Sequence, residues 1–390
     1  MIDFEMTEEQ RMIRDTAHKF AEKEIRPVAA HHDETEEMPW DVMKKAHEIG
    51  LTTFYFPEEY GGGGVTDHVA RYIVNEELAW GCAGIATSIM GTGLAAGAIL
   101  GMGTEEQKKK YIPMFTDPKQ LRIGAMALTE PQAGSDVKMI SATAVRDGDK
   151  YVLNGTKCFI TNGGIADIEV IFATTDKSLG LMGLAAFIVA KGTPGLKMGK
   201  KEKKLGVRAS HTAEVILDNC RVPIENRLGG EPGTEGAGPG AFGALTLLEM
   251  TRPSVGAAAV GVARAALEYA TEYAKERVQM GQPIIRHQGI GFKLADMAIQ
   301  VDAARLLVWR AGWMADRLMP FARGEGSMAK CYAGDVAMWV TTEALQILGG
   351  YGYMKDYPLE KWMRDAKIYQ IWEGTAEIQR LVIARMLRVS

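Results

Sequence analysis

The first third of the chain carries apolar residues at helical spacing. Thr7-Glu8-Glu9-Gln10 matches a capping box, in which the Thr and Gln side chains satisfy free backbone N–H groups at a helix start. A second Thr-Glu-Glu-Gln begins at Thr104. Further helical patterns cover 40–50, 67–80 and 85–100, and a glycine-rich loop at 57–64 interrupts them. This part of the chain therefore predicts a helical domain.

The hydrophobic period changes near residue 121 to one typical of strands. Segment 141–145 leads into Asp147-Gly148, and segment 151–153 leads into Asn154-Gly155. Both dipeptides are strong hairpin signals. Further short strands are expected at 168–175, 185–189 and 214–217. Short strands with tight turns and no helices between them predict an antiparallel barrel or sandwich.

The last part of the chain returns to helices after a connector rich in Gly and Pro at 229–243. Long helical patterns follow at about 245–278, 287–318, 324–348 and 373–388. We therefore expect an α+β protein with an N-terminal helical domain, a central antiparallel β-barrel domain and a C-terminal four-helix bundle. The predicted boundaries are 1–120, 121–233 and 234–390, and the two helical domains are expected to pack as one body.

Composition excludes several functional classes. The 390 residues are 47% hydrophobic and 24% charged, which is ordinary for a globular protein. The net charge of −4 offers no basic field for nucleic acid. The apolar stretch 85–100 is too short and too rich in glycine to predict a membrane span. The four cysteines lie far apart without a C-x-x-C pair, so neither a metal site nor a disulfide framework is expected.

The first residues of the chain are acidic where a targeting segment would be basic. A cytoplasmic protein is therefore expected, or one of the mitochondrial matrix if a transit peptide has been removed.

Several familiar motifs are present without the context that they need. Segment 238–243 matches G-x-G-x-x-G, and 91–96 matches its alanine variant. A dinucleotide fingerprint must follow a parallel strand and open a helix, whereas these segments lie in a connector and in a helical stretch. Ser135-x-x-Lys138 and Ser327-x-x-Lys330 match part of a penicillin-binding site, but the chain has no Lys-Thr-Gly.

Two segments carry candidate functional residues. Segment 127–136 carries hydroxyls at Thr129 and Ser135 beside Gly134, and such a loop can bind a heterocycle or a phosphate, or be an ordinary turn. Segment 366–375 places Glu373 between Trp372 and a glycine after an apolar run. A desolvated carboxylate there suits a general base near neutral pH. The alternative is a surface glutamate at a helix N-terminus.

These segments and several others, taken together, resemble the acyl-CoA dehydrogenase family nearly end to end. The resemblance rests on 7–10, 57–64, 129–136, 159–164, 204–208, 251–252, 346–352 and 369–380. It implies the three-domain fold expected above and an FAD cofactor between the barrel and the C-terminal helices. It also implies an oxidoreductase of fatty acid metabolism, assembled as a homotetramer that is a dimer of dimers.

The resemblance assigns the FAD contacts residue by residue. Those from the barrel are Met126, Leu128, Thr129, Ser135, Phe159, Ile160 and Thr161, with Thr375 and Glu377 after the catalytic segment. Those that would reach a neighbouring subunit's cofactor are Arg277, Met280, Gln288, Gln346, Gly349 and Gly350. Phe159 stands where the family more often has Trp, and Met280 where Phe is common. Phe159 keeps a stacking surface but lacks the indole donor.

The resemblance makes Glu373 the catalytic base, which removes the α-proton of an acyl thioester while the β-hydrogen leaves as hydride to the flavin. Some relatives carry the base at the position of Thr251, which cannot serve. The implied substrate contacts are Ser135, Glu249, Arg252, Gly374, Thr87 and Met90. Segment 82–100 has no charged residue, which disfavours a dicarboxyl substrate and favours a straight, branched or cyclic apolar acyl group.

The implied electron acceptor is an electron-transfer flavoprotein. Three rival functions stay open on the same fold: an acyl-CoA oxidase, an enoyl-CoA reductase, and a flavin-free acyl-CoA-binding protein without catalysis. Chain length disfavours the oxidase, and the presence of Glu373 and Arg277 disfavours the non-catalytic protein.

Overall fold

The computed structural model describes residues 4–231 and 240–389. Its N-terminal region is helical, as predicted. The helices are α1 (Glu8–Phe20), α2 (Ala29–Thr35), α3 (Trp40–Glu48), α4 (His68–Gly81), α5 (Ala83–Met90), α6 (Thr92–Met102) and α7 (Glu105–Thr116), with a π-helical turn η1 (Ala21–Ile25) after α1 and short 3-10 turns η2 (Arg26–Val28) and η3 (Glu58–Tyr60). Both capping boxes are confirmed: the Thr7 hydroxyl accepts from Gln10 N, and the Thr104 hydroxyl accepts from Gln107 N.

The stretch expected as one helix at 85–100 is two helices that meet at Gly91. The segment Ala83–Met102 is long and apolar enough to cross a membrane, judged by length and composition alone. It is the one candidate of this kind among the described residues. Half of its most apolar window is buried inside the protein, and the break between α5 and α6 leaves each helix short. Packing in the core accounts for the apolar character of the buried half of this segment.

The middle region is one curled sheet. Its strands are β1 (Gly124–Ala127), β2 (Thr143–Asp147), β3 (Lys150–Thr161), β4 (Ile168–Thr174), β5 (Leu184–Ala190), β6 (Leu196–Lys201) and β7 (Thr212–Pro223), with the short turns η4 (Val137–Met139), η5 (Lys177–Gly183) and η6 (Ile224–Asn226) between or after them. The strand order is β1-β4-β2-β3-β7-β6, and β5 pairs with β4. Most pairs are antiparallel as predicted, but β1 and β2 both pair with β4 in parallel, so the sheet is mixed.

One of the two predicted hairpins is wrong. Asp147-Gly148 does connect β2 to β3, with Asp147 opposite Lys150. Asn154-Gly155 lies inside β3, where the register with β7 shifts between Leu153 and Gly155. Gly155 has a φ of 146°, and a Cβ there would lie 2.6 Å from the Ala142 side chain. The glycine therefore serves a β-bulge against a close neighbour rather than a turn.

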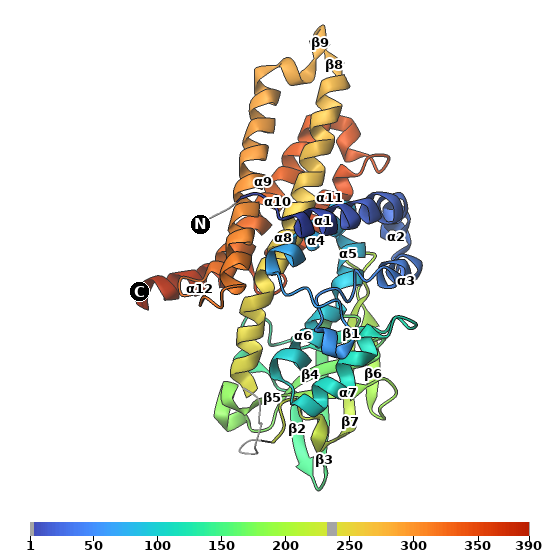
Figure 1. Cartoon of the computed structure of the whole chain (residues 1–390), viewed down its shortest axis with the longest axis vertical. Coiled ribbons are helices and arrows are strands. Elements are labelled where there is room, and N and C mark those ends of the chain that lie inside the picture. The colour runs from blue at the N-terminus through green and yellow to red at the C-terminus, as the bar shows by residue number, and fades with distance from the viewer. Residues whose placement is uncertain (1–3, 232–239, 390) are drawn as a thin grey trace.

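The C-terminal region consists mainly of long helices. They are α8 (Gly240–Glu276), α9 (Gln288–Ala315), α10 (Glu325–Leu348), α11 (Leu359–Ala366) and α12 (Ala376–Val389), with the β8 (Val278–Gln279) and β9 (Gln282–Pro283) hairpin and the short turns η7 (Ile284–Arg286), η8 (Gly349–Tyr353) and η9 (Lys367–Gln370). The four predicted helices are present, and α11 is additional. Figure 1 shows α8 running from the sheet to the β8–β9 hairpin, a length of roughly 55 Å at 1.5 Å per residue. Pro253 lies inside α8.

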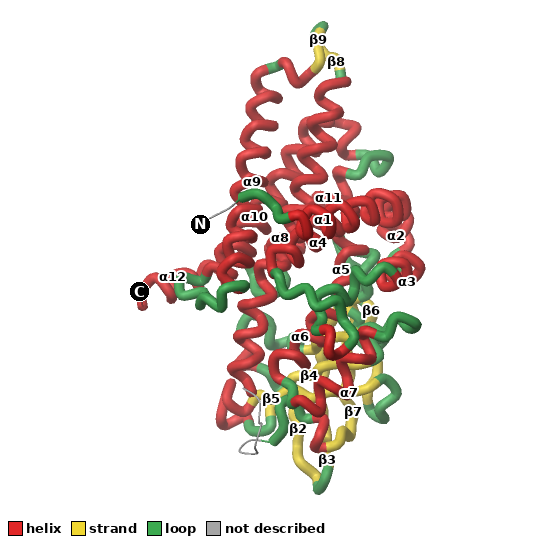
Figure 2. The backbone as a smooth tube through the Cα atoms, in the orientation of Figure 1, coloured by secondary structure: helices red, strands yellow, loops and turns green. Residues whose placement is uncertain are grey.

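The two helical regions pack as one body, as predicted, because α4 lies against α8 and α9. In Figure 2 most of the helices lie toward one end of the molecule and most of the strands toward the other, with α6 and α7 beside the sheet. The predicted domain boundary at 120/121 remains a prediction, and the boundary at 233/234 lies outside the described residues. The G-x-G-x-x-G match at 238–243 lies partly outside them too, and its last four residues begin α8.

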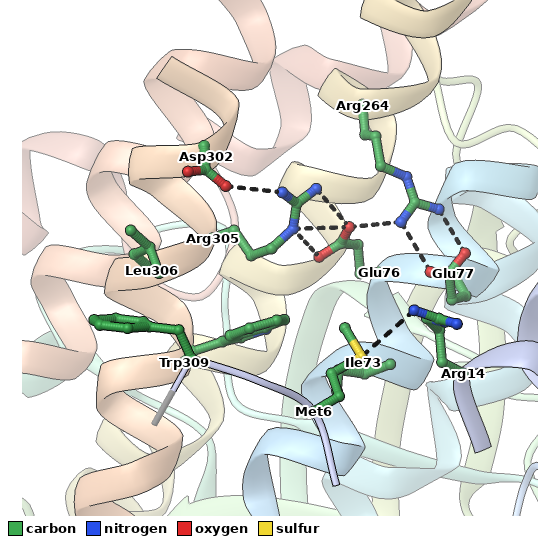
Figure 3. A pocket seen from close by; sticks show the side chains of 11 residues that line it. Met6, Arg14, Ile73, Glu76, Glu77, Arg264, Asp302, Arg305, Leu306 and Trp309 are labelled. Carbon is green, nitrogen blue, oxygen red and sulfur yellow. Dashed lines mark hydrogen bonds and ion pairs between the residues drawn. The ribbon is translucent and has the colours of Figure 1, made fainter. Parts of the chain in front are cut away.

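An ion-pair network joins α4, α8 and α9 beside a cavity of about 510 Å³ (Figure 3). The Arg264 guanidinium donates to Glu76 and Glu77 at 2.8 Å each, and Arg305 donates to Glu76 at 2.9 Å. Each arginine that faces this cavity from α8 or α9 is already matched by a carboxylate. The network therefore holds the helical regions together.

Candidate active site

Glu373 lies in the short segment between η9 and α12, where the chain turns through two left-handed residues. Glu373 has a φ of 51° and Gly374 a φ of 91°. A non-glycine residue in this region costs of order 1–3 kcal/mol, and such strain clusters at functional sites. Gln379 on α12 donates to the carbonyl oxygens of Glu373 (3.0 Å) and Gly374 (2.9 Å), which fixes the turn.

The Glu373 carboxylate faces α8. The Thr251 hydroxyl donates to Glu373 Oε2 at 2.7 Å. Burial raises the pKa of the Glu373 carboxyl above its ordinary value, against the lowering effect of Thr251 and of the positive charges of Lys330 and Arg252. A carboxyl group with a raised pKa suits proton abstraction near neutral pH.

A buried arginine lies beside Thr251 on the same helix. The Arg252 guanidinium forms an ion pair with Glu249 and donates to the Ser327 hydroxyl on α10 at 2.9 Å. Its Nε has no hydrogen-bond partner among the described residues. The structure thus brings together Glu249, Arg252 and Glu373, which the sequence predicted for one site.

The predicted barrel contacts to FAD lie along one rim of the sheet. Met126 is the second-last residue of β1, and Leu128 and Thr129 follow directly after this strand. Thr161 is the last residue of β3. Ser135 is exposed in the following loop, and Ile160 is buried in the core. Phe159 is 66% exposed and has a φ of 59°, beside a register shift in β3. A large aromatic ring held outward by strained backbone is the feature that a planar ring system would cover.

A buried ion pair between Lys157 and Glu130 stabilises the segment of this rim that follows β1. Lys157 Nζ donates to Glu130 Oε1 at 2.7 Å and to the Leu128 carbonyl at 3.0 Å. Glu130 also accepts from the backbone N–H groups of Ser141 (2.7 Å) and Ala142 (3.0 Å). The segment that carries Leu128 and Thr129 is therefore fixed before any ligand binds.

The second predicted FAD set lies at the opposite end of the molecule. Its members are Arg277 at the end of α8, Met280 in the β8–β9 turn, Gln288 at the start of α9, Gln346 in the last turn of α10, and Gly349 and Gly350 in η8. The Arg277 guanidinium lies 5.5 Å from the ring centre of Tyr351, which brings the first and last of these segments together. Figure 1 places the hairpin and the sheet at the two extremes of the long axis. One chain therefore cannot surround one dinucleotide with both sets.

The remaining predicted residues are more scattered. Thr87 and Met90 lie on α5, where the Thr87 hydroxyl donates to the Ala83 carbonyl at 2.8 Å within the helix. The Thr375 hydroxyl accepts from Ile378 N at 3.3 Å at the start of α12, and Glu377 is exposed.

The sequence reasoning missed Lys330 and Gln379, which both contact the Gly374 carbonyl. The Ser327-x-x-Lys330 spacing, set aside as an incomplete motif, was the available signal, since it places both side chains on one face of a helix. Within the described parts of the chain, there is no cluster of His, Cys, Asp and Glu side chains that could hold a metal ion.

Three family profiles match the chain in order. They are described as acyl-CoA dehydrogenase N-terminal domain (residues 7–118), middle domain (125–220) and C-terminal domain (238–388).

Full-length relatives agree with the profiles. An acyl-CoA dehydrogenase of Bacillus subtilis is 47% identical and covers 98% of both chains. An acryloyl-CoA reductase (NADH) of Anaerotignum propionicum is 46% identical over 98% of this chain and 95% of its own. A short-chain specific acyl-CoA dehydrogenase of Clostridium acetobutylicum is 44% identical over 98% and 99%.

Solved structures share the fold. Butyryl-CoA dehydrogenase from Megasphaera elsdenii matches with a TM-score of 0.94 at 43% identity, covering 99% of this chain and all of that one. A structure described as electron transferring flavoprotein of Acidaminococcus fermentans matches with a TM-score of 0.92 at 45% sequence identity, covering 99% of each chain. A structure described as PigA with FAD and proline matches with a TM-score of 0.91 at 28% sequence identity, covering all of both chains.

The order of the three matched domains and the full-length identity to these relatives agree with the helix–sheet–helix architecture described above. The chain belongs to the acyl-CoA dehydrogenase family.

Proposed function

We propose that this protein is an FAD-dependent dehydrogenase that converts a short acyl-CoA thioester to the 2-enoyl-CoA, with Glu373 as the base. The observation that carries the proposal is the Glu373 carboxylate, partly buried, hydrogen-bonded to Thr251 and held on a strained turn. FAD, when bound, would supply the acceptor for the β-hydrogen of the acyl group, which leaves as a hydride.

The chain's own residues handle the proton. Glu373 Oε2 accepts a hydrogen bond from Thr251, whereas Oε1 accepts none from the described residues, so Oε1 is the atom that takes the α-proton. Burial holds the pKa of Glu373 above its ordinary value, which makes the carboxylate a stronger base than one in water. We infer that Arg252, the residue after Thr251 on α8, binds the CoA moiety, because its positive charge lies close enough to act on Glu373.

The residues present fit FAD. The exposed Phe159 ring and the neighbouring Thr129 and Thr161 offer an aromatic face and hydroxyls on one rim. Arg277, at the far end of the chain, can meet a phosphate with two hydrogen bonds. Since the two sets lie apart, we infer that each cofactor is shared between neighbouring copies, as in a homotetramer built as a dimer of dimers.

A short apolar acyl group is the proposed substrate. The α5–α6 segment that would wall the acyl chain carries no charged residue, so a second carboxylate on the substrate would be buried without a partner. Relatives named short-chain specific and butyryl-CoA dehydrogenase support an acyl chain of this size.

An electron-transfer flavoprotein is the proposed electron acceptor, supported by the match to the Acidaminococcus structure. A second candidate is the reverse reaction, reduction of a short enoyl-CoA, in which Glu373 would deliver the proton. The acryloyl-CoA reductase relative favours it specifically. Steady-state rates in both directions, with butyryl-CoA or crotonyl-CoA and a purified electron-transfer flavoprotein, distinguish the two.

The test of the base is Glu373→Gln in the FAD-loaded enzyme. The variant should keep FAD and bind butyryl-CoA, but the rate of flavin bleaching should fall by roughly 10²–10⁴-fold. Glu48→Gln, which changes an exposed carboxylate on α3, is the matched control and should bleach at the normal rate. Bleaching by Glu373→Gln at the control rate would remove Glu373 from the mechanism.

A further inference from the structure

Helix α10 places a buried lysine directly behind the turn that carries Glu373. Lys330 is 1% exposed, and its Nζ donates to the Gly374 carbonyl at 2.6 Å. One helical turn earlier, Ser327 accepts from Arg252 at 2.9 Å. Two side chains on the same face of α10 therefore form hydrogen bonds to the Gly374 carbonyl and to Arg252 of α8.

The charged groups around Lys330 are mostly negative. Burial lowers the pKa of Lys330 to about 8; the negative charges of Glu373 and Asp335 and the neighbouring Cys331 thiol oppose this, whereas Arg252 adds to it. A buried ammonium, cut off from water, is stabilised by a nearby carboxylate. Glu373 is the largest of these electrostatic partners.

Lys330 and Gln379 contact the same carbonyl but differ in charge. Gln379 holds the carbonyls of Glu373 and Gly374 through a neutral amide. Lys330 adds a charge-assisted hydrogen bond, which is roughly twice as strong as a neutral one. Geometry and charge at this turn can therefore be separated by changing one side chain at a time.

We propose that Lys330 is a positioning residue for Glu373: its ammonium anchors the Gly374 carbonyl, keeps the left-handed turn, and supplies the positive charge that holds Glu373 as a carboxylate ready to accept a proton. The inference rests on the proposed role of Glu373 as the base. It predicts effects on both the geometry and the ionisation of that carboxylate.

The experiment compares Lys330→Gln, Lys330→Met and Lys330→Arg with Gln379→Leu, all as FAD-loaded full-length protein. The kcat/KM for butyryl-CoA is measured against pH, and infrared spectra follow the protonated Glu373 carboxyl, identified by its loss in Glu373→Gln. Lys330→Gln and Lys330→Met should move the acidic limb of kcat/KM and the infrared titration upward by about one pH unit or more. Lys330→Arg should restore the wild-type limb, at least in part.

Gln379→Leu should lower kcat by about tenfold or more through the loosened turn, with the acidic limb left in place. If Lys330→Met fails to fold, Lys330→Gln and Lys330→Arg still report the effect of the charge. An unchanged limb and an unchanged infrared titration in Lys330→Gln would overturn the inference. If Glu373→Gln also turns over normally, the proposed base fails as well; if it is inactive, only the role of Lys330 is lost.

Discussion

The Lys157 ammonium lies 2.7 Å from the Glu130 carboxylate, and neither side chain reaches solvent. Burial alone would raise the pKa of Glu130, but Lys157 and the backbone N–H groups of Ser141 and Ala142 outweigh it and hold that pKa below its ordinary value. The pair joins β3, which carries Lys157, and the residues just before β2 to the segment that carries Leu128 and Thr129.

Removing one partner should destabilise the protein strongly. Lys157→Met leaves an unpaired carboxylate in the core, and we expect the free energy of unfolding to fall by roughly 3–5 kcal/mol in urea titrations. The FAD content of the purified variant should fall with it, because the Leu128 carbonyl loses its anchor. Lys197→Met, which breaks the exposed pair with Asp218, is the control and should leave both measurements unchanged. A Lys157→Met protein of normal stability would contradict this account of the rim.

Glu169 predicts a pH-dependent stability. Its side chain is fully buried in β4, accepts from Gly164 N at 2.8 Å and leaves Oε2 without a partner among the described residues. Burial raises its pKa to about 7 from 4.5. Because ionisation is penalised only in the folded state, stability should fall as the pH rises from about 4.5 to about 7, by roughly 3 kcal/mol in total.

Glu169→Gln removes that ionisation and keeps an acceptor for Gly164. Its unfolding free energy should exceed that of the wild type at pH 8, and the difference should shrink as the pH falls toward 5. Parallel curves for the two proteins across this range would show that the Glu169 carboxyl does not titrate near neutrality.

Thr251 should determine the pH at which kcat/KM falls on the acidic side, through its effect on the pKa of Glu373. Its hydroxyl stabilises the charged form of Glu373, so Thr251→Val should raise the pKa of that carboxyl. We expect the acidic limb of kcat/KM to move up by about one unit. Thr271→Val is the matched control, because that α8 hydroxyl donates to the Leu267 carbonyl within its own helix. Identical limbs in Thr251→Val and Thr271→Val would refute the contact's role.

Gly374 should tolerate no side chain. It has a φ of 91°, and a Cβ would lie 2.6 Å from Gln379 Nε2. Gly374→Ala should therefore displace Glu373 and lower kcat by roughly 10²-fold. Gly148→Ala is the control, because Gly148 also has a positive φ, of 62°, but no atom lies within 4 Å of the added Cβ. This variant has the strain of a left-handed alanine without a steric clash, and it should keep full turnover. Equal activity in the two variants would mean that the turn adjusts without loss.

The long helices could be predicted because their apolar period persists over many residues, as in α8 to α10. The sheet was harder. Strand β1 is four small or flexible residues, and β6 is mostly exposed, so neither shows a strand pattern. Asn154-Gly155 was misassigned because a bulge and a hairpin turn both favour glycine, and only the partner strand distinguishes them.

The candidate site depended on contacts between distant segments. Local chemistry left Glu373 open between a base and a surface carboxylate, and the resemblance to a family decided between them. The Thr251 hydroxyl, 122 residues away, contacts Glu373, and the Lys330 ammonium contacts the neighbouring Gly374 carbonyl. Both contacts depend on the packing of α8 and α10 against this turn, which no local pattern encodes. The assignments of the FAD and substrate contacts remain predictions.

Pro253 interrupts the backbone hydrogen bonding of α8 at one position. It has no N–H to offer the Glu249 carbonyl, and Gly326 of α10 lies so close to that oxygen that a Cβ would stand 2.7 Å away. Because proline is a common cause of helix bending, we expect α8 to bend within one turn of Thr251 and Arg252 rather than in the stretch that ends beside Arg277. The part of α8 that faces Glu373 can therefore shift while the part that ends beside Arg277 stays in place.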